Sequence, residues 1–365
     1  MRILTRYVFV EFLVPLVYCL VGFFAIYVLF ELSGSFSRLM EARPPFGDAV
    51  SYFCGYLAPY VKYLMPAALL LATIYTMWSF CRHSELIAMR AGGVGFLTIV
   101  RPLLAVALVA AGGVVWLDEC YVPARAQWAK RFKSARFRYD EIEFGKDLVY
   151  CNVVGRRTWS VGAIEDVRGE RLRGVRVTQD RGDGRRERTI FAERADFMDG
   201  EWWLTNPVVQ HFDVSGREVP SPTPGLDGLK LRCFPELDER PADLVIQNRD
   251  WSFTSVAEKF RFIRMHPDMS AHDRADHLYD AWAQLFAPLA CLIVTLFAIP
   301  AGIASGRQSV FRGILGALAL FFAFYAFTLL AMACEKKGWL PPLAAVLLPD
   351  VVFLAVGLRG LWRQR

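Results

Sequence analysis

Uncharged apolar runs long enough to cross a bilayer constrain this chain more than any other feature. The run from Phe12 to Phe30 contains no charged residue, and about 20 residues at 1.5 Å of helical rise match the thickness of a bilayer core. Further spans are expected at about 56–78, 97–117, 279–303, 313–334 and 339–358. The chain is therefore predicted to be an α-helical membrane protein with six transmembrane helices.

The middle of the chain has a different pattern. With 55% hydrophobic and 21% charged residues, the 365-residue sequence is too apolar for an ordinary soluble protein and too charged to lie wholly in lipid. Between 121 and 250, alternation replaces the long apolar runs: Val175 and Val177 point to one face, and the intervening Arg176 to the other. Asp183–Gly184 and Asp199–Gly200 are turn signals. These features predict an all-β, jelly-roll-like domain inserted between helices 3 and 4.

The expected domain boundaries follow from these changes in pattern. Residues 1–120 are predicted to hold transmembrane helices 1–3 with a short cytoplasmic helix near 84–93, and residues 121–250 the β-domain. A juxtamembrane connecting helix is expected in 251–278, and helices 4–6 in 279–365.

Orientation follows from Lys and Arg in the short connections, because cytoplasmic loops carry the excess. One side carries Arg2, Arg6, Arg82, Arg90, Arg101, Arg307, Arg312, Arg359, Arg363 and Arg365. The opposite side carries Arg38, Arg43, Lys336 and Lys337. Both termini are therefore expected in the cytoplasm, and the β-domain in the periplasm of a Gram-negative cell. The first apolar run is too long for a cleavable signal peptide, so it is expected to anchor the chain in the inner membrane.

The stretch from Ser84 to Gly95 is a short amphipathic segment between two apolar runs. Ser84 is expected to cap a helix with Glu85 in its first turn, and Gly92 and Gly93 to end it. Its apolar side would consist of Leu86, Ile87 and Met89, and its polar side of Glu85 and Arg90. Such a helix suits the groove of a partner protein. An ordinary surface-loop helix explains the same pattern.

This segment, and the order of elements around it, resemble the LptF/LptG family of lipopolysaccharide-export permeases over the whole chain. Other matching pieces are the opening MRILTRYV, Pro123, the AIPAG of Ala298–Gly302 and the GWLPPLAAVLLPD of Gly338–Asp350. In that family the segment is the coupling helix that seats in an ATPase, with an acidic residue matching Glu85. The resemblance therefore implies a coupling role for Ser84, Glu85, Leu86, Met89 and Arg90. The opening MRILTRYV favours the G-like member.

The resemblance also implies a function: a permease subunit of an ATP-driven complex that extracts lipopolysaccharide from the inner membrane. The implied partners are a paralogous six-span permease, a cytoplasmic ABC ATPase dimer and a periplasmic, membrane-anchored β-jelly-roll protein of LptC type. The sequence has no GxxxxGK[ST] phosphate loop. We therefore expect a non-catalytic chain that binds no cofactor, with ATP and Mg²⁺ used by the partner ATPase, and no nucleic-acid partner.

Lipid contacts are expected at two kinds of residue. Lys62, inside a span near its outer end, and Arg38 and Arg43 on the outer loop are candidates for an anionic lipid headgroup, although Lys62 would also be explained by snorkelling to the interface. The resemblance implies that the first and fifth spans line a lipid cavity between two permeases. The candidate lining residues are Gly22, Phe23, Tyr27, Gly316, Phe321 and Phe324. Ordinary helix packing explains the small residues equally well.

Two other sets of residues, the histidines and aspartates of 266–277 and the cysteines, are interpreted as structural. A polar juxtamembrane helix accounts for His266, Asp268, His272, Asp273, Asp276 and His277 without a metal ion. The eight cysteines are scattered, so they do not form a disulfide framework. A single disulfide between Cys151 and Cys233 remains an alternative.

Other classes of function compete with transport by an ATP-driven permease. The chain could be a membrane-anchored protein that binds or senses an envelope ligand and transports nothing. A secondary transporter would need ionisable residues near mid-membrane, and only Lys62 and Asp350 approach that depth. An ABC transporter of the four-span mechanotransmission type is disfavoured by six spans.

Overall fold

The structure is a computed structural model, and its contacts divide the chain into two units that are described separately. The membrane unit comprises Met1–Phe36, Leu57–Cys120 and Ala271–Arg365, and the β unit comprises Ser37–Tyr56 and Tyr121–Ser270. The residues that the structure describes are 2–135, 137, 146–166, 169–182, 184–214, 216–219, 230–246, 251–267, 269–305 and 310–364.

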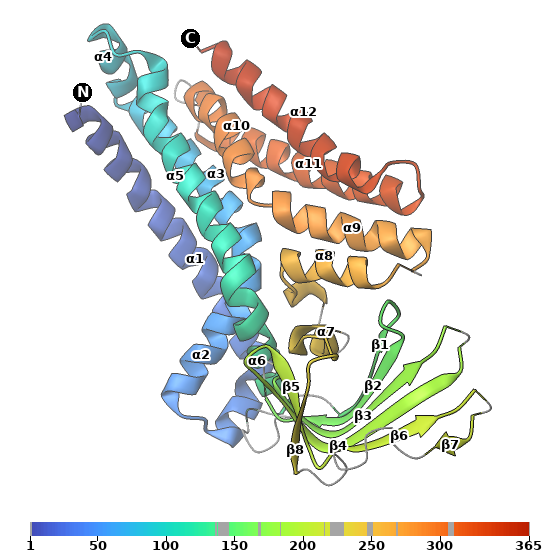
Figure 1. Ribbon diagram of the computed structural model, residues 1–365. Coiled ribbons are helices and arrows are strands. Elements are labelled where there is room, and N and C mark those ends of the chain that lie inside the picture. Colours follow the sequence, from blue (N-terminus) through green and yellow to red (C-terminus); the bar gives the residue numbers. More distant parts are fainter. Residues whose placement is uncertain are drawn as a thin grey trace. The chain divides into compact units, whose positions relative to one another are not determined.

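The membrane unit is helical throughout its described part (Figure 1). Its elements are α1 (Arg2–Ala42, whose last residues belong to the β unit), η1 (Ala58–Tyr60), α3 (Val61–Arg82), α4 (Glu85–Ala91), α5 (Phe96–Trp116), η2 (Leu117–Tyr121), α9 (Ala271–Phe286), α10 (Leu289–Ser305), α11 (Val310–Lys336) and α12 (Pro342–Trp362). Among the described residues, five helical segments are long and apolar enough to span a membrane, and a bent pair would make a sixth.

The bent pair is α9 and α10, which meet at 55°. Pro288 lies in the break, and because proline has no backbone N–H it interrupts the helical hydrogen-bond ladder there. The span predicted at 279–303 is therefore two helices joined at an angle. With this detail, the prediction of a helical membrane protein with an inserted β-domain is confirmed.

Close helix crossings in the membrane unit lie at glycines other than those expected. A Cβ on Gly302 of α10 would approach Met77 Cβ of α3 to 2.7 Å, and one on Gly357 of α12 would approach Leu296 Cβ of α10 to 3.0 Å. In contrast, a Cβ on Gly22 or Gly316 would meet nothing within 4 Å. Within this chain, α10 is thus the helix against which α3 and α12 pack closely.

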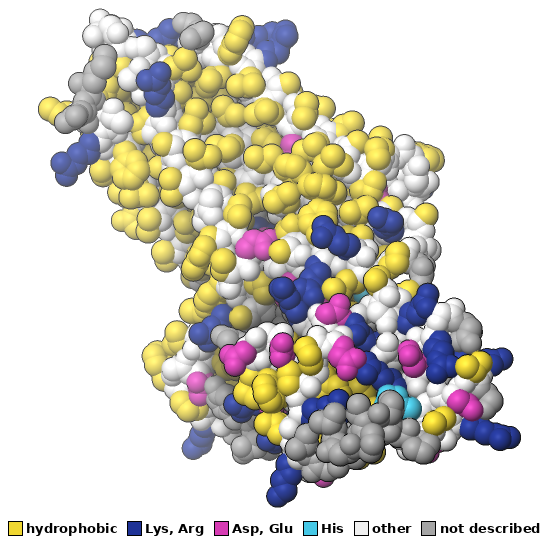
Figure 2. Space-filling model, viewed as in Figure 1, with side chains coloured by type: hydrophobic (Ala, Val, Ile, Leu, Met, Phe, Trp, Pro, Cys, Tyr) yellow, Lys and Arg dark blue, Asp and Glu magenta, His cyan; other side chains and the backbone are white. Residues whose placement is uncertain are grey.

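The outer surface of the membrane unit is apolar. On the face shown in Figure 2, hydrophobic side chains cover most of its helices. Helix α1 buries a narrow stripe of Val8, Phe12 and Leu16 in the largest core cluster, and leaves most of its other apolar side chains exposed. Such a surface suits lipid or another membrane chain.

The β unit contains helices and one antiparallel sheet. Its helices are α2 (Phe46–Leu57, of which the last residue belongs to the membrane unit), α6 (Val122–Ser134), α7 (Pro241–Ile246), η4 (Trp251–Phe253) and α8 (Val256–Met265). Its strands are β1 (Lys146–Asn152), β2 (Arg157–Ile164), β3 (Arg171–Asp180), β4 (Arg186–Met198), β5 (Glu201–Thr205), β6 (Val208–Phe212), β7 (Glu218–Val219) and β8 (Leu231–Phe234).

The described strands pair in the order β1-β2-β3-β4-β5-β8. The long strand β4 branches the sheet, because its first half pairs with β6 and its second half with β5. Asp199 and Gly200 join β4 to β5 with φ values of 54° and 87°, as expected for a two-residue hairpin turn with positive φ at both positions. The predicted turn at Asp199–Gly200 is confirmed, whereas Asp183 lies outside the described residues.

Helix α6 opens the second segment of the β unit, whereas the sequence predicted a β-domain from residue 121. Helix α6 buries Ala126, Ala129 and Phe132 at helical spacing. It crosses α2 so closely that a Cβ on Gly55 would lie 2.7 Å from the carbonyl oxygen of Arg125. The dense Lys and Arg of this stretch obscure the helical pattern in the sequence.

Candidate functional site

Helix α4 begins in a way that the sequence did not indicate. Ser84 occupies the N-cap position with a left-handed φ of 60°, and its side chain makes no capping hydrogen bond. The predicted Ser84 cap is therefore wrong. The cause is the tight turn after α3, in which the Ser84 backbone N–H donates to the carbonyl oxygen of Cys81 at 3.2 Å.

The end of α4 follows the prediction. Gly93 has a φ of 79°, its N–H donates to the carbonyl of Arg90, and the N–H of Val94 donates to the carbonyl of Met89. This pair of bonds is a Schellman motif, which requires the left-handed residue that glycine supplies. The glycines therefore fix where the segment turns towards α5.

The side chains of α4 divide between the chain's own core and solvent. Leu86 is 6% exposed and belongs to the same core cluster as Val8 and Phe12, and Met89 packs against that cluster. Ile87 is 60% exposed, and Arg90 is exposed. The predicted apolar side is thus not one docking face, because Leu86 anchors α4 internally while Ile87 and Arg90 face outwards.

Glu85 has a partner that sequence reasoning missed. The hydroxyl of Tyr7, in the first turns of α1, donates to Oε2 of Glu85 at 2.8 Å. The Tyr7 ring also lies 6.1 Å from the ring of Phe80 on α3. The opening MRILTRYV, which resembles the family, contains Tyr7, but nothing in it indicates that Tyr7 contacts Glu85.

Lys62, on α3, forms a loose ion pair within the membrane unit. Its Nζ is 4.0 Å from Oδ2 of Asp118 in η2, with side-chain exposures of 17% and 7%. The same Nζ lies 5.4 Å from the centre of the Tyr63 ring. Asp118 directly follows the third span expected at 97–117, and the sequence did not identify it as the partner of Lys62.

The other headgroup candidates belong to the β unit. Arg38 is exposed on the last turns of α1, and Arg43 is exposed with a φ of 43° immediately before Pro44. These arginines therefore belong to a different unit from Lys62, and their role at a headgroup stays a prediction.

The cavity candidates have unequal environments. Phe23 and Phe321 are partly buried against core clusters, and Tyr27 lies 4.4 Å from Tyr60 between ring centroids. Phe324 is 4% exposed. Phe324 is thus a correction to the prediction, because it packs inside the chain's own core and does not face an external cavity.

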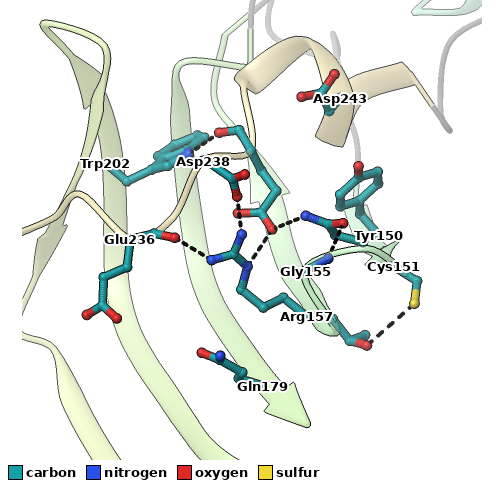
Figure 3. Close-up of polar contacts among 12 residues, drawn as sticks. Tyr150, Cys151, Gly155, Arg157, Gln179, Trp202, Glu236, Asp238 and Asp243 are labelled. Atoms are coloured by element: carbon teal, nitrogen blue, oxygen red, sulfur yellow. Dashed lines mark hydrogen bonds and ion pairs between the residues drawn. The ribbon is translucent and has the colours of Figure 1, made fainter. Parts of the chain in front are cut away.

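A polar cluster in the β unit is built around Arg157 of β2 (Figure 3). Its Nε donates to Oε1 of Glu239 at 2.8 Å, and its two terminal nitrogens contact Asp238 and the carbonyl oxygen of Glu236. Asn152 Nδ2 donates to the same Glu239 oxygen at 2.7 Å. The indole N–H of Trp202 donates to the Glu239 carbonyl at 2.6 Å. These bonds fix the segment after β8 to the sheet.

The same segment covers the apolar face of the sheet. Leu237 and Leu244 belong to one core cluster with the fully buried Trp159 and Trp202. Nearby, the Arg188 guanidinium hydrogen-bonds Glu236 and lowers the pKa of that carboxyl. This polar cluster was not predicted, because its partners are about 80 residues apart in the sequence.

The described residues form neither the Cys151–Cys233 bridge that the sequence left open nor a cluster suited to a metal ion. Cys151 and Cys233 are not disulfide-bonded and lie on β1 and β8, at opposite ends of the strand order. Burial and a hydrogen bond to Glu201 raise the pKa of the Cys233 thiol to about 11. The described residues include no group of three or more His, Cys, Asp or Glu suited to a metal ion, and Asp268 lies outside them.

Comparison with known proteins gives one family. A family model described as "Lipopolysaccharide export system permease LptF/LptG" matches residues 6–363. The match therefore includes both units, with α4 and the inserted sheet. No curated protein matches the sequence.

Proposed function

The chain belongs to the lipopolysaccharide export system permease family LptF/LptG, and we propose that it is the transmembrane subunit of an ATP-driven lipopolysaccharide exporter. It is a multi-pass inner-membrane protein of the permease type. Both termini would lie in the cytoplasm and the β unit in the periplasm. A related permease would complete the membrane part, and an ATPase dimer would supply ATP hydrolysis.

Helix α4 is the proposed contact with the ATPase. Its outward-facing Ile87 and Arg90 provide an apolar and a cationic contact, and the Glu85 carboxylate lies in its first turn. Figure 1 supports a common side for α4 and the two termini, since all three lie at the same end of the membrane unit. Because Leu86 seats α4 in the core cluster, a push on this helix would reach the packed helices behind it.

The transport step would be mechanical. Closure of the ATPase dimer would displace α4, the cavity between the two permeases would narrow, and the lipid held there would be expelled towards the periplasm. The exposed apolar side chains of α1 suit such a cavity. Lys62 would meet a lipid phosphate by exchanging Asp118 for the phosphate, which is favoured by the loose 4.0 Å pair.

The β unit would receive the lipid and pass it to a periplasmic β-jelly-roll protein of LptC type. Its apolar sheet face is covered by Leu237 and Leu244. Acyl chains that used this face would therefore have to replace the segment that carries these two leucines.

One observation carries the proposal: the family match spans residues 6–363, and within it a short helix with an N-terminal carboxylate lies between two apolar helices. The test is charge reversal, Glu85→Lys, in the tagged full-length chain expressed with its native partners. A charge-assisted contact with the ATPase would be replaced by repulsion, so ATPase recovery in the pull-down should fall about tenfold or more. Glu218→Lys, on the exposed strand β7, is the matched control and should recover normal amounts.

Normal ATPase recovery and normal lipopolysaccharide release with Glu85→Lys would contradict the docking role of α4. A chain that purified without any ATPase, even unsubstituted, would instead favour the alternative of an envelope ligand-binding or sensory protein.

A further inference from the structure

The contact between Tyr7 and Glu85 joins two helices that the proposed mechanism treats separately. The donor lies on α1 and the acceptor on α4, 78 positions apart, with 2.8 Å between the hydroxyl and Oε2. A hydrogen bond to an ionised carboxylate is stronger than one between neutral groups. This bond therefore ties the cytoplasmic-end turn of α1 directly to the residue assigned to ATPase docking.

Packing around this bond makes α1 and α4 parts of one body. Val8 and Phe12 of α1 and Leu86 of α4 belong to the same buried cluster, which also contains Phe80 of α3. The Tyr7 ring contacts the Phe80 ring. Close-packed side chains transmit displacement because they cannot be compressed individually. A shift of α4 is thus resisted on its apolar side by the core and on its polar side by Tyr7.

We propose that Tyr7 is a positioning residue that carries the movement of α4 to α1. This inference rests on the proposed function, in which α4 receives the ATPase stroke and α1 lines the lipid cavity. Tyr7 holds the Glu85 carboxylate through one oxygen, and a carboxylate accepts several hydrogen bonds. A cationic group of the ATPase can therefore bind Glu85 while Tyr7 remains bonded, so that docking and transmission share one carboxylate without competing for it.

The test is Tyr7→Phe in the full chain with its native partners, reconstituted in vesicles that contain lipopolysaccharide. The substitution keeps the ring packing on Phe80 and removes only the hydroxyl. ATPase recovery and ATP hydrolysis should stay within about twofold of the unsubstituted complex, whereas lipopolysaccharide released per ATP should fall about fivefold or more. Tyr75→Phe is the matched control, because Tyr75 lies on α3, outside the helix proposed to line the cavity, and is 53% exposed. The control variant should release normal amounts of lipopolysaccharide per ATP.

A second variant separates the hydrogen bond from the charge. Glu85→Gln keeps an oxygen that accepts from Tyr7 but loses the negative charge, so it should weaken ATPase recovery more than it uncouples the ATPase that remains bound. Tyr7→Phe should show the reverse. A merely structural role for Tyr7 predicts equal losses of recovery, hydrolysis and release.

Hydrogen exchange in the detergent-solubilised chain measures the contact without relying on transport. Tyr7→Phe should speed exchange of the α4 amides by about fivefold or more, and Tyr75→Phe should not. Unchanged exchange would overturn the contact, and changed exchange with normal release per ATP would overturn the transmission role. If the unsubstituted chain bound no ATPase, the proposed function would fail and transmission with it. The exchange result would still show whether α1 and α4 are joined.

Discussion

Two buried ion pairs, one in each unit, differ in how closely their charged groups are joined by hydrogen bonds. In the β unit, Arg157 uses all three guanidinium nitrogens, and the Glu239 carboxylate accepts from both Arg157 and Asn152. In the membrane unit, Lys62 and Asp118 are 4.0 Å apart, which is beyond hydrogen-bonding distance.

The difference indicates different uses of buried charge. A buried pair joined by direct hydrogen bonds holds one geometry, here through Glu239 Oε1 although Oε2 accepts none, and its disruption leaves an uncompensated charge. A pair without a direct hydrogen bond loses less interaction energy when one member binds another partner. We therefore interpret the Arg157 cluster as a fixed clamp on the segment after β8, and Lys62–Asp118 as a pair that an anionic headgroup can exchange.

Loss of the clamp should have the largest effect. Arg157→Ala leaves Glu239 buried without its cation, which should destabilise the β unit by about 3–5 kcal/mol. Hydrogen exchange of β2 and β8 amides in the full chain should accelerate by about 100-fold or more. Arg194→Ala is the matched control: Arg194 pairs with Glu165 at the surface and should cost about 0–1 kcal/mol.

The double variant Arg157→Met with Glu239→Leu sharpens this result. Because it removes both charges, it should recover a large part of the lost protection. If Arg157→Ala cost no more than the surface control, the cluster would not be a clamp.

Substitutions in the Lys62–Asp118 pair should change lipopolysaccharide binding more than the stability of the fold. Lys62→Met removes the cation, so the lipopolysaccharide that co-purifies with the complex should fall about tenfold. Asp118→Asn weakens the hold on Lys62 and should keep or raise that amount, which makes it the natural control. Equal losses in both variants would indicate a structural pair, as in the β unit, and would remove the contrast.

The smallest effect is expected for the Arg188–Glu236 pair beside the Arg157 cluster. Because Arg188 lowers the pKa of Glu236, this pair stabilises the folded state above the unfolded glutamate pKa of about 4.3. That contribution is lost as pH falls through the lower folded pKa. Glu236→Gln should therefore cost about 1 kcal/mol or less at neutral pH, and its exchange rates should converge with those of the unsubstituted chain in acid. A constant difference at all pH values would contradict this origin.

Features set by local pattern were predictable from the sequence. Apolar runs predicted the helices, and Asp199–Gly200 predicted a hairpin turn because it is a residue pair that tolerates positive φ. The end of α4 at Gly92 and Gly93 followed from the same chemistry. The break at Pro288 was not foreseen, since its residues read as one apolar run.

Features that depend on distant partners were not predictable. Nothing local to Tyr7 indicates Glu85, and nothing local to Arg157 indicates Glu239, because each contact is made by the folded chain. The close-packing glycines were misplaced for the same reason: Gly22 and Gly302 look alike in the sequence, but only Gly302 meets another helix of this chain. Ser84 failed as a cap because the preceding turn fixed its backbone.

The most direct test of the central claim is a pull-down of the tagged chain from detergent-solubilised native membranes, with mass spectrometry of the recovered proteins and lipids. The exporter account predicts an ABC ATPase, a second six-span permease and lipid A-containing lipopolysaccharide in the eluate. Recovery of the chain alone, with no ATPase and no lipopolysaccharide, would contradict it.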